Sequence, residues 1–508
     1  MKKSTFGRTA AALALAAAFG ASALPSQAQQ ADFTTYVALG DSLTAGFTDG
    51  CWVKHGQIDS YVAIIARQAG AADFQQPLLD EPGVGSGVGA GKGCLVLQSL
   101  APAFTRKVSD PKPLNLTLAR PYNNLAVPGY NIHDVTTTKA AVQNSNPLTD
   151  LVLRGLGGGT TALQQAASLR PTFVTVFIGN NDVLGAATSG TVIDGVTLTP
   201  AAPFTTDINT IAQTLKAAQG GTGKGIFFTV PDVASIPFTS TIPPFIVVGG
   251  QPVINPATGA PFTYLSSRNN NSAIAPIPAN SLLTLNAAGF LPSGFGIPCA
   301  VLNAGGVPAT SPLRTNCDKP LPDSAIAAAG IPGVVLYPEE VSLLRSRTAE
   351  YNFAIVAAAT ANGYKVFNVG SYFDDLKANG REFGGMTVTT SFLSGGLFSY
   401  DGVHPTSLGY AIFADEIIRF INDNYGNNIP RPNLSPFFFN GNAQSGGYPL
   451  SAFPLTPVET IAWGAEIFNS EMWAAQRQFH PLTRSFGLTL GEDAHPITGA
   501  RVFLDRTD

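Results

Sequence analysis

Four short apolar runs, rich in β-branched and aromatic residues, recur along the chain, and each ends at or near a glycine or a proline. They are residues 36–39, 173–178, 225–230 and 364–369. Hydrophobic side chains stand at consecutive rather than alternating positions, which is typical of strands that are buried on both faces of a parallel sheet. The pattern therefore predicts four strands of one such sheet.

Segments with a helical spacing of apolar positions lie between these runs. From Asp207, the expected N-cap, to Gln219, apolar residues recur at every third or fourth position. A longer helix is expected over 338–362, with Pro338 in its first turn, and another over 406–424. Strands that alternate with helices predict βαβ units and a three-layer α/β/α sandwich.

Two regions interrupt this alternation, about 48–118 and 234–336, and both are rich in Gly, Pro, Ser and Thr. Loops of this length are usually functional or disordered, but the apolar content of these regions argues against disorder. We expect inserts that line a pocket, cover a cleft or simply pack against the core. The main domain is expected over 29–428, with an extension over 429–508 that packs on it and contains a helix-like segment at 458–479.

The amino-terminal residues 1–28 have the pattern of a signal peptide. Three basic residues precede an Ala/Leu-rich apolar run, and Ser26-Gln27-Ala28 is a small-x-small cleavage site. A membrane anchor is disfavoured because the run ends at Pro25 and the cleavage site. We therefore expect export to the periplasm or the extracellular space.

The chain has four cysteines, and an even number in an exported protein favours disulfides. Three pairings are possible. We favour Cys51 with Cys94 and Cys299 with Cys317, because each bond would close a Gly/Pro-rich loop. A zinc site is not expected, since the spacings contain no Cys-x-x-Cys. The net charge of −4, without a basic cluster, argues against a nucleic-acid partner.

Candidate chemistry begins with Ser42, which directly follows the first predicted strand, where α/β sheets place their ligands. A backbone N–H at a helix start also favours an anion. His404 lies three residues after Asp401 and just before a helix. This spacing lets the carboxylate hold imidazole Nδ1 and leaves Nε2 for a serine, which is the arrangement of a Ser–His–Asp triad. A surface histidine beside a helix-start aspartate is the alternative.

Two further residues are candidates to stabilise an oxyanion. Asn181 follows the second predicted strand and has a side-chain amide, and Gly129 lets a backbone N–H come close to a ligand. Taken singly, Asn-Asp and Pro-Gly are ordinary turn signals. The combination of all these candidates in one order is what indicates ester hydrolysis.

In that order the chain resembles the SGNH hydrolases, also called the GDSL esterase/lipase family, over roughly residues 33–424. The blocks that carry the resemblance are Gly40-Asp41-Ser42-Leu43, Asn124-Leu125-Ala126-Val127-Pro128-Gly129, Gly179-Asn180-Asn181-Asp182 and Asp401-Gly402-Val403-His404. The resemblance implies a flavodoxin-like α/β/α fold with a parallel sheet and large loop inserts. It also implies a serine-hydrolase mechanism that needs no metal or organic cofactor.

Block by block, Ser42 is similar to the family's nucleophile, and His404 and Asp401 to the other two members of its triad. The oxyanion hole would consist of Ser42, Gly129 and Asn181, with Asp41 and Asp182 in supporting roles. One departure from the family pattern is Pro128, which stands where a small polar residue is more typical.

The resulting expectation is a secreted serine hydrolase that cleaves carboxylic esters through an acyl-enzyme. Its substrate would be a small-molecule or lipid ester, the latter with transient contact to a membrane or lipid surface. Two alternatives stay open: a carbohydrate O-acetylesterase of the same fold, and a non-catalytic exported binding protein. The sequence determines neither the natural ester nor the oligomeric state.

Overall fold

The computed structural model describes residues 30–85, 93–97, 104–106, 111–140, 146, 148–248, 250–268, 273–323, 333–383 and 386–439. The expected signal peptide and the helix-like segment at 458–479 lie outside the described residues. Among the described helices, none combines the length and the apolar character needed to span a lipid bilayer.

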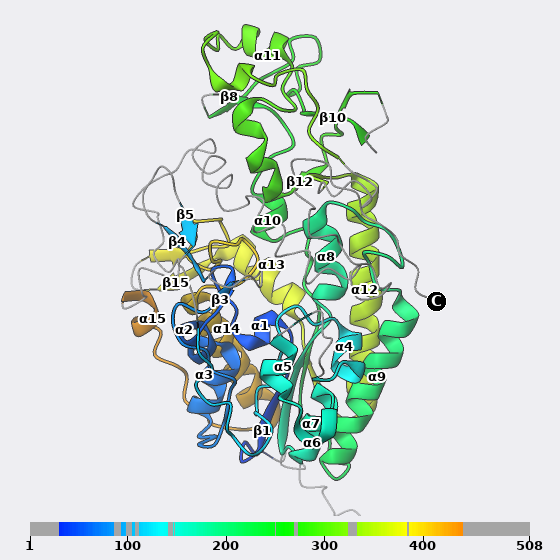
Figure 1. The fold of residues 1–508 in the computed structure, drawn as a ribbon, viewed down its shortest axis with the longest axis vertical. Helices are drawn as coiled ribbons and strands as arrows, with labels where there is room; N and C mark the ends of the chain where they lie inside the picture. Colours follow the sequence, from blue (N-terminus) through cyan, green and yellow to red (C-terminus); the bar gives the residue numbers. More distant parts are fainter. Residues whose placement is uncertain are drawn as a thin grey trace, which may run out of the picture.

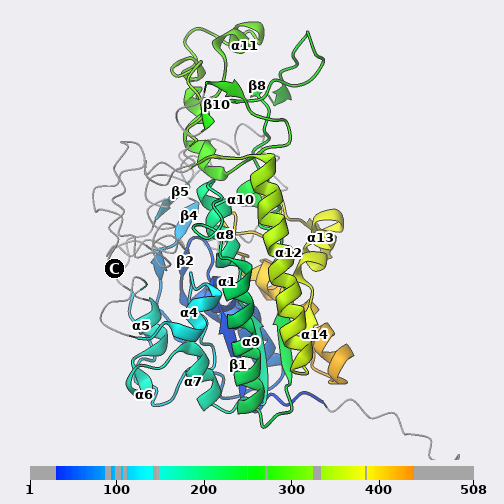
Figure 2. The ribbon, with the colours of Figure 1, turned by 90° about the vertical axis from the view of Figure 1, so that its right-hand side faces the viewer.

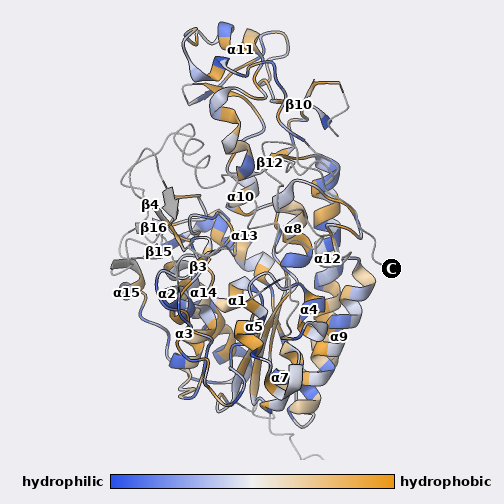
Figure 3. Ribbon diagram, viewed as in Figure 1, coloured by the Kyte–Doolittle hydropathy of each residue, from blue (hydrophilic) through white to orange (hydrophobic). Residues whose placement is uncertain are grey.

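A four-stranded parallel sheet forms the centre of the molecule, in the order β1, β6, β7, β14 (Figure 1). In the register of the first pair, Tyr36 lies opposite Phe173 and Gly40 opposite Phe177. All four strands coincide with the predicted apolar runs, and they are coloured hydrophobic along most of their length in Figure 3. The strands are β1 (Tyr36–Gly40), β6 (Phe173–Phe177), β7 (Gly225–Phe228) and β14 (Lys365–Phe367).

Residues 123–127 extend this sheet at the free edge of β1. The N–H of Leu125 donates to the carbonyl of Ala38, and the N–H of Val127 donates to that of Gly40, so the segment runs parallel to β1. In chain order the sheet is then 2-1-3-4-5, which is the flavodoxin-like order. The order reverses at β1, and ligands of such sheets bind at the carboxyl ends of the strands beside this switch point.

Helices cover both faces of the sheet, which confirms the expected α/β/α sandwich (Figure 2). Alternate strand residues point to opposite layers: Val37 and Leu39 into one apolar core, Tyr36 and Ala38 into the other. The first layer contains α4 (Ile132–Thr137), α5 (Leu148–Leu153), α7 (Ala162–Ser168), α8 (Asn181–Ser189), α9 (Ala201–Ala218) and α12 (Pro338–Ala361), with the short α6 (Leu156–Gly159) between α5 and α7. The second contains α2 (Lys54–Asp59), α3 (Tyr61–Gln68), α13 (Val369–Asn379) and α14 (Ser407–Tyr425), and α15 (Ser435–Phe439) contacts α14.

Helix α9 begins earlier than expected. Asp207 is not its N-cap: the helix starts at Ala201, after Pro200, and Asp207 lies in its second turn. Pro203 does not interrupt it, because the N–H groups of the first turn have no acceptor within the helix. The predicted start of α12 at Pro338 is confirmed.

The region expected as the first insert, 48–118, begins with helical structure that belongs to the second layer. Helices α2 and α3 lie within it, because the apolar run 61–66 is long enough to form a buried helix face. The irregular part therefore starts only after Gln68. It contains β3 (Val84–Gly85), which pairs with β2 (Cys51–Trp52) from the segment before the two helices. It also contains β4 (Leu95–Leu97), which pairs with β5 (Phe104–Arg106).

The second insert, 234–336, forms a unit with its own apolar core at one end of the molecule (Figures 1 and 2). That core also includes Phe373 and Tyr400 of the main domain, so the insert packs against it. Its elements are α10 (Pro237–Ser240), β8 (Val247–Val248), β9 (Gln251–Pro252), β10 (Leu265–Ser266), β11 (Ala275–Pro276), β12 (Leu282–Leu283), η2 (Leu285–Gly289), η3 (Leu291–Ser293), α11 (Cys299–Ala304), η4 (Pro312–Arg314) and β13 (Val335–Leu336). The pair β15 (Arg381–Phe383) and β16 (Met386–Val388) follows α13.

Both expected disulfides are present. Cys51 is bonded to Cys94 beside the sheet, and Cys299 is bonded to Cys317 in the second insert.

The stacked rings of Phe204 and Tyr351 join the two long helices α9 and α12, with centroids 4.0 Å apart. We expect Phe204→Ala to lower the free energy of unfolding by about 3–5 kcal/mol, because the side chain is fully buried and its removal leaves a cavity. Phe353→Ala on α12 is the control, because Phe353 is 79% exposed. Urea unfolding of both variants checks this, and equal midpoints would contradict it.

Candidate active site

Ser42 is the first residue of α1 (Ser42–Ala45), directly after β1. The Asp41 side chain caps this helix by accepting a hydrogen bond from the N–H of Leu43 at 3.0 Å. The backbone N–H of Ser42 lies in the first turn, where it has no acceptor within the helix. The sequence therefore places a hydroxyl and a helix-start N–H together at the switch point of the sheet.

His404 reaches this hydroxyl from the loop that precedes α14. Its Nε2 lies 2.8 Å from Oγ of Ser42, across 362 positions of the chain. Its Nδ1 lies 2.8 Å from Oδ2 of Asp401. Ser42 thus contacts His404, and His404 contacts Asp401, in the order that a Ser–His–Asp triad requires.

The Asp401 carboxylate is buried and accepts several hydrogen bonds. The N–H groups of Val403 and His404 and the hydroxyl of Ser399 donate to Oδ1 at 2.9, 2.8 and 3.2 Å. The N–H of Gly50 donates to Oδ2 at 2.9 Å. Burial alone would raise the pKa of Asp401, but the charge of His404 and the hydrogen bonds from His404 and Val403 outweigh it and lower the pKa. Sequence reasoning missed Ser399 and Gly50.

The ionised state of Asp401 determines which nitrogen of His404 carries the proton. A carboxylate only accepts hydrogen bonds, so Nδ1 bears the hydrogen and Nε2 is left as the acceptor for the Ser42 hydroxyl. The imidazole can then take the serine proton, and the buried carboxylate would stabilise the imidazolium that results.

Gly129 lies in a tight turn at the end of the segment that runs beside β1. The N–H of Tyr130 donates to the carbonyl of Val127, and Gly129 has a φ of 84°. Proline at the second and glycine at the third position, with a positive φ at the third, are the features of a type II turn. Pro128 is therefore suited to this backbone, although it departs from the family pattern.

Asn181 begins α8, in the loop region after β6, on the opposite side of the switch point from Gly129. Its side-chain Nδ2 donates to the carbonyl of Tyr130 at 2.8 Å. An amide nitrogen carries two hydrogens. One of them orients the side chain through this bond, and the second is available to a further acceptor.

Asp41 and Asp182 are both fully buried beside these residues. Asp41 accepts from Nδ2 of Asn180 at 2.8 Å, and Asp182 accepts from the N–H of Ile132 at 2.9 Å. Burial raises the pKa of Asp41 to about 6 and that of Asp182 to about 7, although these hydrogen bonds oppose the shifts. Asp41 therefore connects the loops after the neighbouring strands β1 and β6, and Asp182 connects the start of α8 to the start of α4. Asn180 was missed, because nothing in its block distinguishes it from its neighbour.

Two other histidines lie in helices and contact carboxylates. His55 in α2 contacts Glu81 at 2.9 Å, and His133 in α4 contacts Asp207 at 3.0 Å. Their carboxylate partners come from distant parts of the chain, so the sequence spacing gave no sign of them.

A metal site is not supported by the one suitable group of side chains within the described residues. Cys299, Cys317 and Asp318 lie close enough to share an ion. The two cysteines, however, are bonded to each other, and a disulfide has no thiolate to offer.

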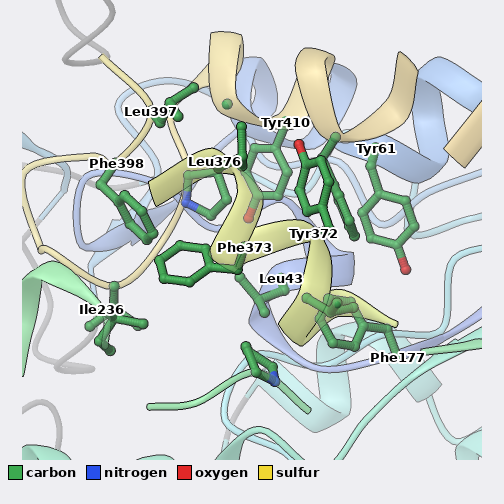
Figure 4. Close-up of a pocket in the computed structure, with 16 residues that line it drawn as sticks. Leu43, Tyr61, Phe177, Ile236, Tyr372, Phe373, Leu376, Leu397, Phe398 and Tyr410 are labelled. Carbon is green, nitrogen blue, oxygen red and sulfur yellow. The ribbon is translucent and has the colours of Figure 1, made fainter. Parts of the chain in front are cut away.

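An apolar pocket of about 110 Å³ is lined in part by sequence neighbours of Ser42 and His404 (Figure 4). Leu43, which follows the serine, lines it together with Val403 and Pro405, which flank the histidine. Aromatic residues of β6 and α13, among them Phe177 and Phe373, form much of the remaining wall. Ile236 is the one contribution from the second insert. The pocket therefore favours a hydrophobic group, and its wall includes the residue after Ser42 and the residues on both sides of His404.

No curated protein matches the sequence. The crystal structure of an α/β hydrolase enzyme from the metagenome of Lake Arreo, Spain, is similar at 12% identity, and the match covers 77% of this chain and 96% of that chain. Its TM-score is 0.30, which is too low to indicate a shared fold. The family model described as GDSL-like Lipase/Acylhydrolase matches residues 36–417, well over half of the chain and all of the residues discussed above. The protein is therefore a hydrolase that belongs to the GDSL-like lipase/acylhydrolase family.

Proposed function

We propose that the protein is an exported carboxylic ester hydrolase that uses Ser42 as nucleophile, His404 as general base and Asp401 as the residue that orients the base. One observation carries the proposal: the two 2.8 Å contacts that join Ser42 to His404 and His404 to Asp401. The buried, ionised state of Asp401 supports it.

In the acylation step, Oγ of Ser42 attacks the ester carbonyl while its proton passes to Nε2 of His404. The tetrahedral intermediate then collapses, the bond to the leaving oxygen breaks, and His404 gives its proton to the departing alcohol. In the second half, water attacks the acyl-enzyme with His404 again as base. The carboxylic acid leaves and Ser42 regains its proton.

The negative charge of the intermediate would be held by the N–H of Ser42, the N–H of Gly129 and the second hydrogen of the Asn181 amide. Donors that are already oriented toward the oxyanion need no reorganisation during the reaction. The bond from Asn181 to Tyr130 supports this role, since it fixes the amide before a substrate arrives.

The acyl group that the pocket favours is apolar and compact. An engineered apolar cavity of about 150 Å³ holds benzene, so a pocket of about 110 Å³ suits a chain of roughly four or five carbons. The short distance in sequence between its lining residues and the triad supports acyl binding there. An acetyl group is smaller, so an acetylesterase would need a pocket with less apolar surface.

The expected signal peptide and both disulfides support export. Structural disulfides form in the periplasm and in extracellular space but rarely in the cytosol.

Ser42→Ala is expected to abolish turnover. The free energy of unfolding should stay within a few tenths of a kcal/mol of the native value, because only one hydroxyl is lost. A fluorophosphonate should label the native enzyme at one site, located at Ser42 by peptide mapping. The control is Ser342→Ala on the exposed side of α12, with native activity. Native turnover by the Ser42 variant would overturn the assignment.

Asn181→Ala is expected to lower kcat by about 10²- to 10³-fold, because the oxyanion loses one donor. KM should change far less, since the ground-state carbonyl carries little charge. Steady-state kinetics with p-nitrophenyl butyrate would measure both constants. A variant with native kcat would remove Asn181 from the oxyanion hole.

Among p-nitrophenyl esters of increasing acyl length, kcat/KM should rise from acetate to about pentanoate, as more apolar surface is buried. Leu376→Phe, which adds volume to the pocket wall, should move the optimum to shorter chains while acetate hydrolysis stays near the native rate. Activity confined to acetate would instead favour the O-acetylesterase alternative.

A further inference from the structure

The turn Thr48–Cys51 lies against the loop that carries Asp401 and His404. The N–H of Thr48 donates to the carbonyl of Cys51 at 3.0 Å, and the N–H of Cys51 donates back at 2.9 Å. Asp49 and Gly50 have φ values of 49° and 65°. A two-residue Asp-Gly connection with positive φ at both positions has the features of a type I′ turn, which is a favoured connection in two-residue hairpins.

Successive residues of this segment contact successive parts of the 399–405 loop. The ring of Phe47 lies 4.7 Å from that of His404, and Thr48 Oγ1 donates to the carbonyl of Pro405 at 3.0 Å. The N–H of Gly50 donates to Asp401 Oδ2, the same oxygen that holds His404 Nδ1. The turn thus bonds directly to one member of the triad and packs on another.

Asp49 adds two bonds that hold the backbone next to Asp401. Its N–H donates to Oγ of Ser399 at 3.0 Å, and its Oδ1 accepts from the N–H of Tyr400 at 3.2 Å. The Ser399 hydroxyl in turn donates to Asp401. Asp49 is therefore connected to Asp401 in two ways. One connection passes through the Ser399 hydroxyl, and the other passes through the backbone of Tyr400.

The Asp49 carboxyl is fully buried, and its Oδ2 has no hydrogen-bond partner among the described residues. Burial raises the pKa of Asp49 well above its ordinary value, and the charge of Asp401 raises it further, against the bond from Tyr400. Two neighbouring buried carboxyl groups do not readily carry two charges. The hydrogen bonds around Asp401 favour its charged form, so the neighbouring Asp49 is the carboxyl group for which burial favours the neutral form.

We propose that Asp49 is a positioning residue for the triad: held in a tight turn, it fixes the Ser399–Asp401 backbone through its two hydrogen bonds and thereby fixes the orientation of His404. The Cys51–Cys94 disulfide anchors this turn, together with the bond from the N–H of Leu95 to the carbonyl of Asp49 at 2.9 Å. The inference rests on the proposed ester hydrolysis and assigns a function to residues outside the four family blocks.

Two substitutions at Asp49 separate its side chain from its backbone conformation. Asp49→Asn keeps a neutral acceptor for Tyr400 and tolerates a positive φ. Asp49→Gly keeps the positive φ and removes the acceptor. We expect kcat within about twofold of native for the Asn variant. For the Gly variant we expect a fall of about 10- to 100-fold at nearly constant KM, because small displacements of a catalytic group cost this much.

The measurement is kcat per phosphonate-titrated active site, so that loss of folded protein does not count as loss of rate. Native kcat in the Gly variant would overturn the proposal, and so would an Asn variant as slow as the Gly variant. Should the Gly variant not fold, Ser399→Ala breaks the second connection, which runs from the Asp49 N–H through the Ser399 hydroxyl to Asp401. Unchanged kcat in that variant would equally overturn the proposal.

A spectroscopic measurement distinguishes failure of this inference from failure of the proposed function. The proton on Nδ1 of His404 should give a far-downfield NMR resonance in the native protein, because it is bonded to a buried carboxylate. That resonance should persist in Asp49→Asn and shift or broaden in Asp49→Gly, even if the natural reaction is not ester hydrolysis. An unchanged resonance in the Gly variant would contradict the positioning role.

The two disulfides allow a matched test of whether the Cys51–Cys94 bond anchors the Thr48–Cys51 turn. Cys51→Ser with Cys94→Ser is expected to lower kcat several-fold. Cys299→Ser with Cys317→Ser removes the disulfide of the second insert and should leave kcat near native. Equal rates in the two double variants would show that the first disulfide has no part in positioning.

Discussion

The hydrogen bond between Ser42 and His404 is the contact on which the rest of the site depends. It joins the end of β1 to the loop before α14, and nothing in the local chain enforces it. The geometry follows from the sheet, which fixes where β1 ends, and from α14, which packs on the opposite side of the same strands from α9 and α12. Because the loop before α14 is short, docking of that helix brings the imidazole to the serine.

Burial of charge is the main physical difficulty of this arrangement. Asp401 is removed from water, and an isolated buried carboxylate would be strongly disfavoured. The structure resolves this with three N–H groups, a hydroxyl and the imidazole around one carboxylate. Asp41, Asp182 and Asp49 are also buried, but burial shifts their pKa upward, so these groups cost less when they are protonated. One site therefore contains carboxyl groups whose pKa values are shifted in opposite directions. The direction depends on how many hydrogen-bond donors surround each carboxyl group.

Much of the fold was predictable because its central strands are apolar at nearly every position, and the short chemical blocks lie after these strands or just before a helix. The three triad candidates were found for this reason, and the structure brings them together. The start of α9 was not predicted, since Pro203 obscures the first turn of the helix. The contacts of Thr48–Cys51 with the 399–405 loop were also missed: the Asp-Gly pair indicates a hairpin turn, but no sequence pattern shows what a turn packs against some 350 residues away. The strands inside the second insert could not be predicted either, because they are only two residues long and too short to show an alternating pattern.

The wide separation of the two halves of the site has a consequence for the timing of activity. During synthesis or passage through a narrow pore, the amino-terminal part of the chain emerges first, so the serine is in place long before the imidazole exists in folded form. Until the last helix docks, the hydroxyl is an ordinary alcohol with no base beside it. On the proposed mechanism, truncated chains that end before α14 would therefore be chemically silent, and the onset of turnover would report that the whole sandwich has closed.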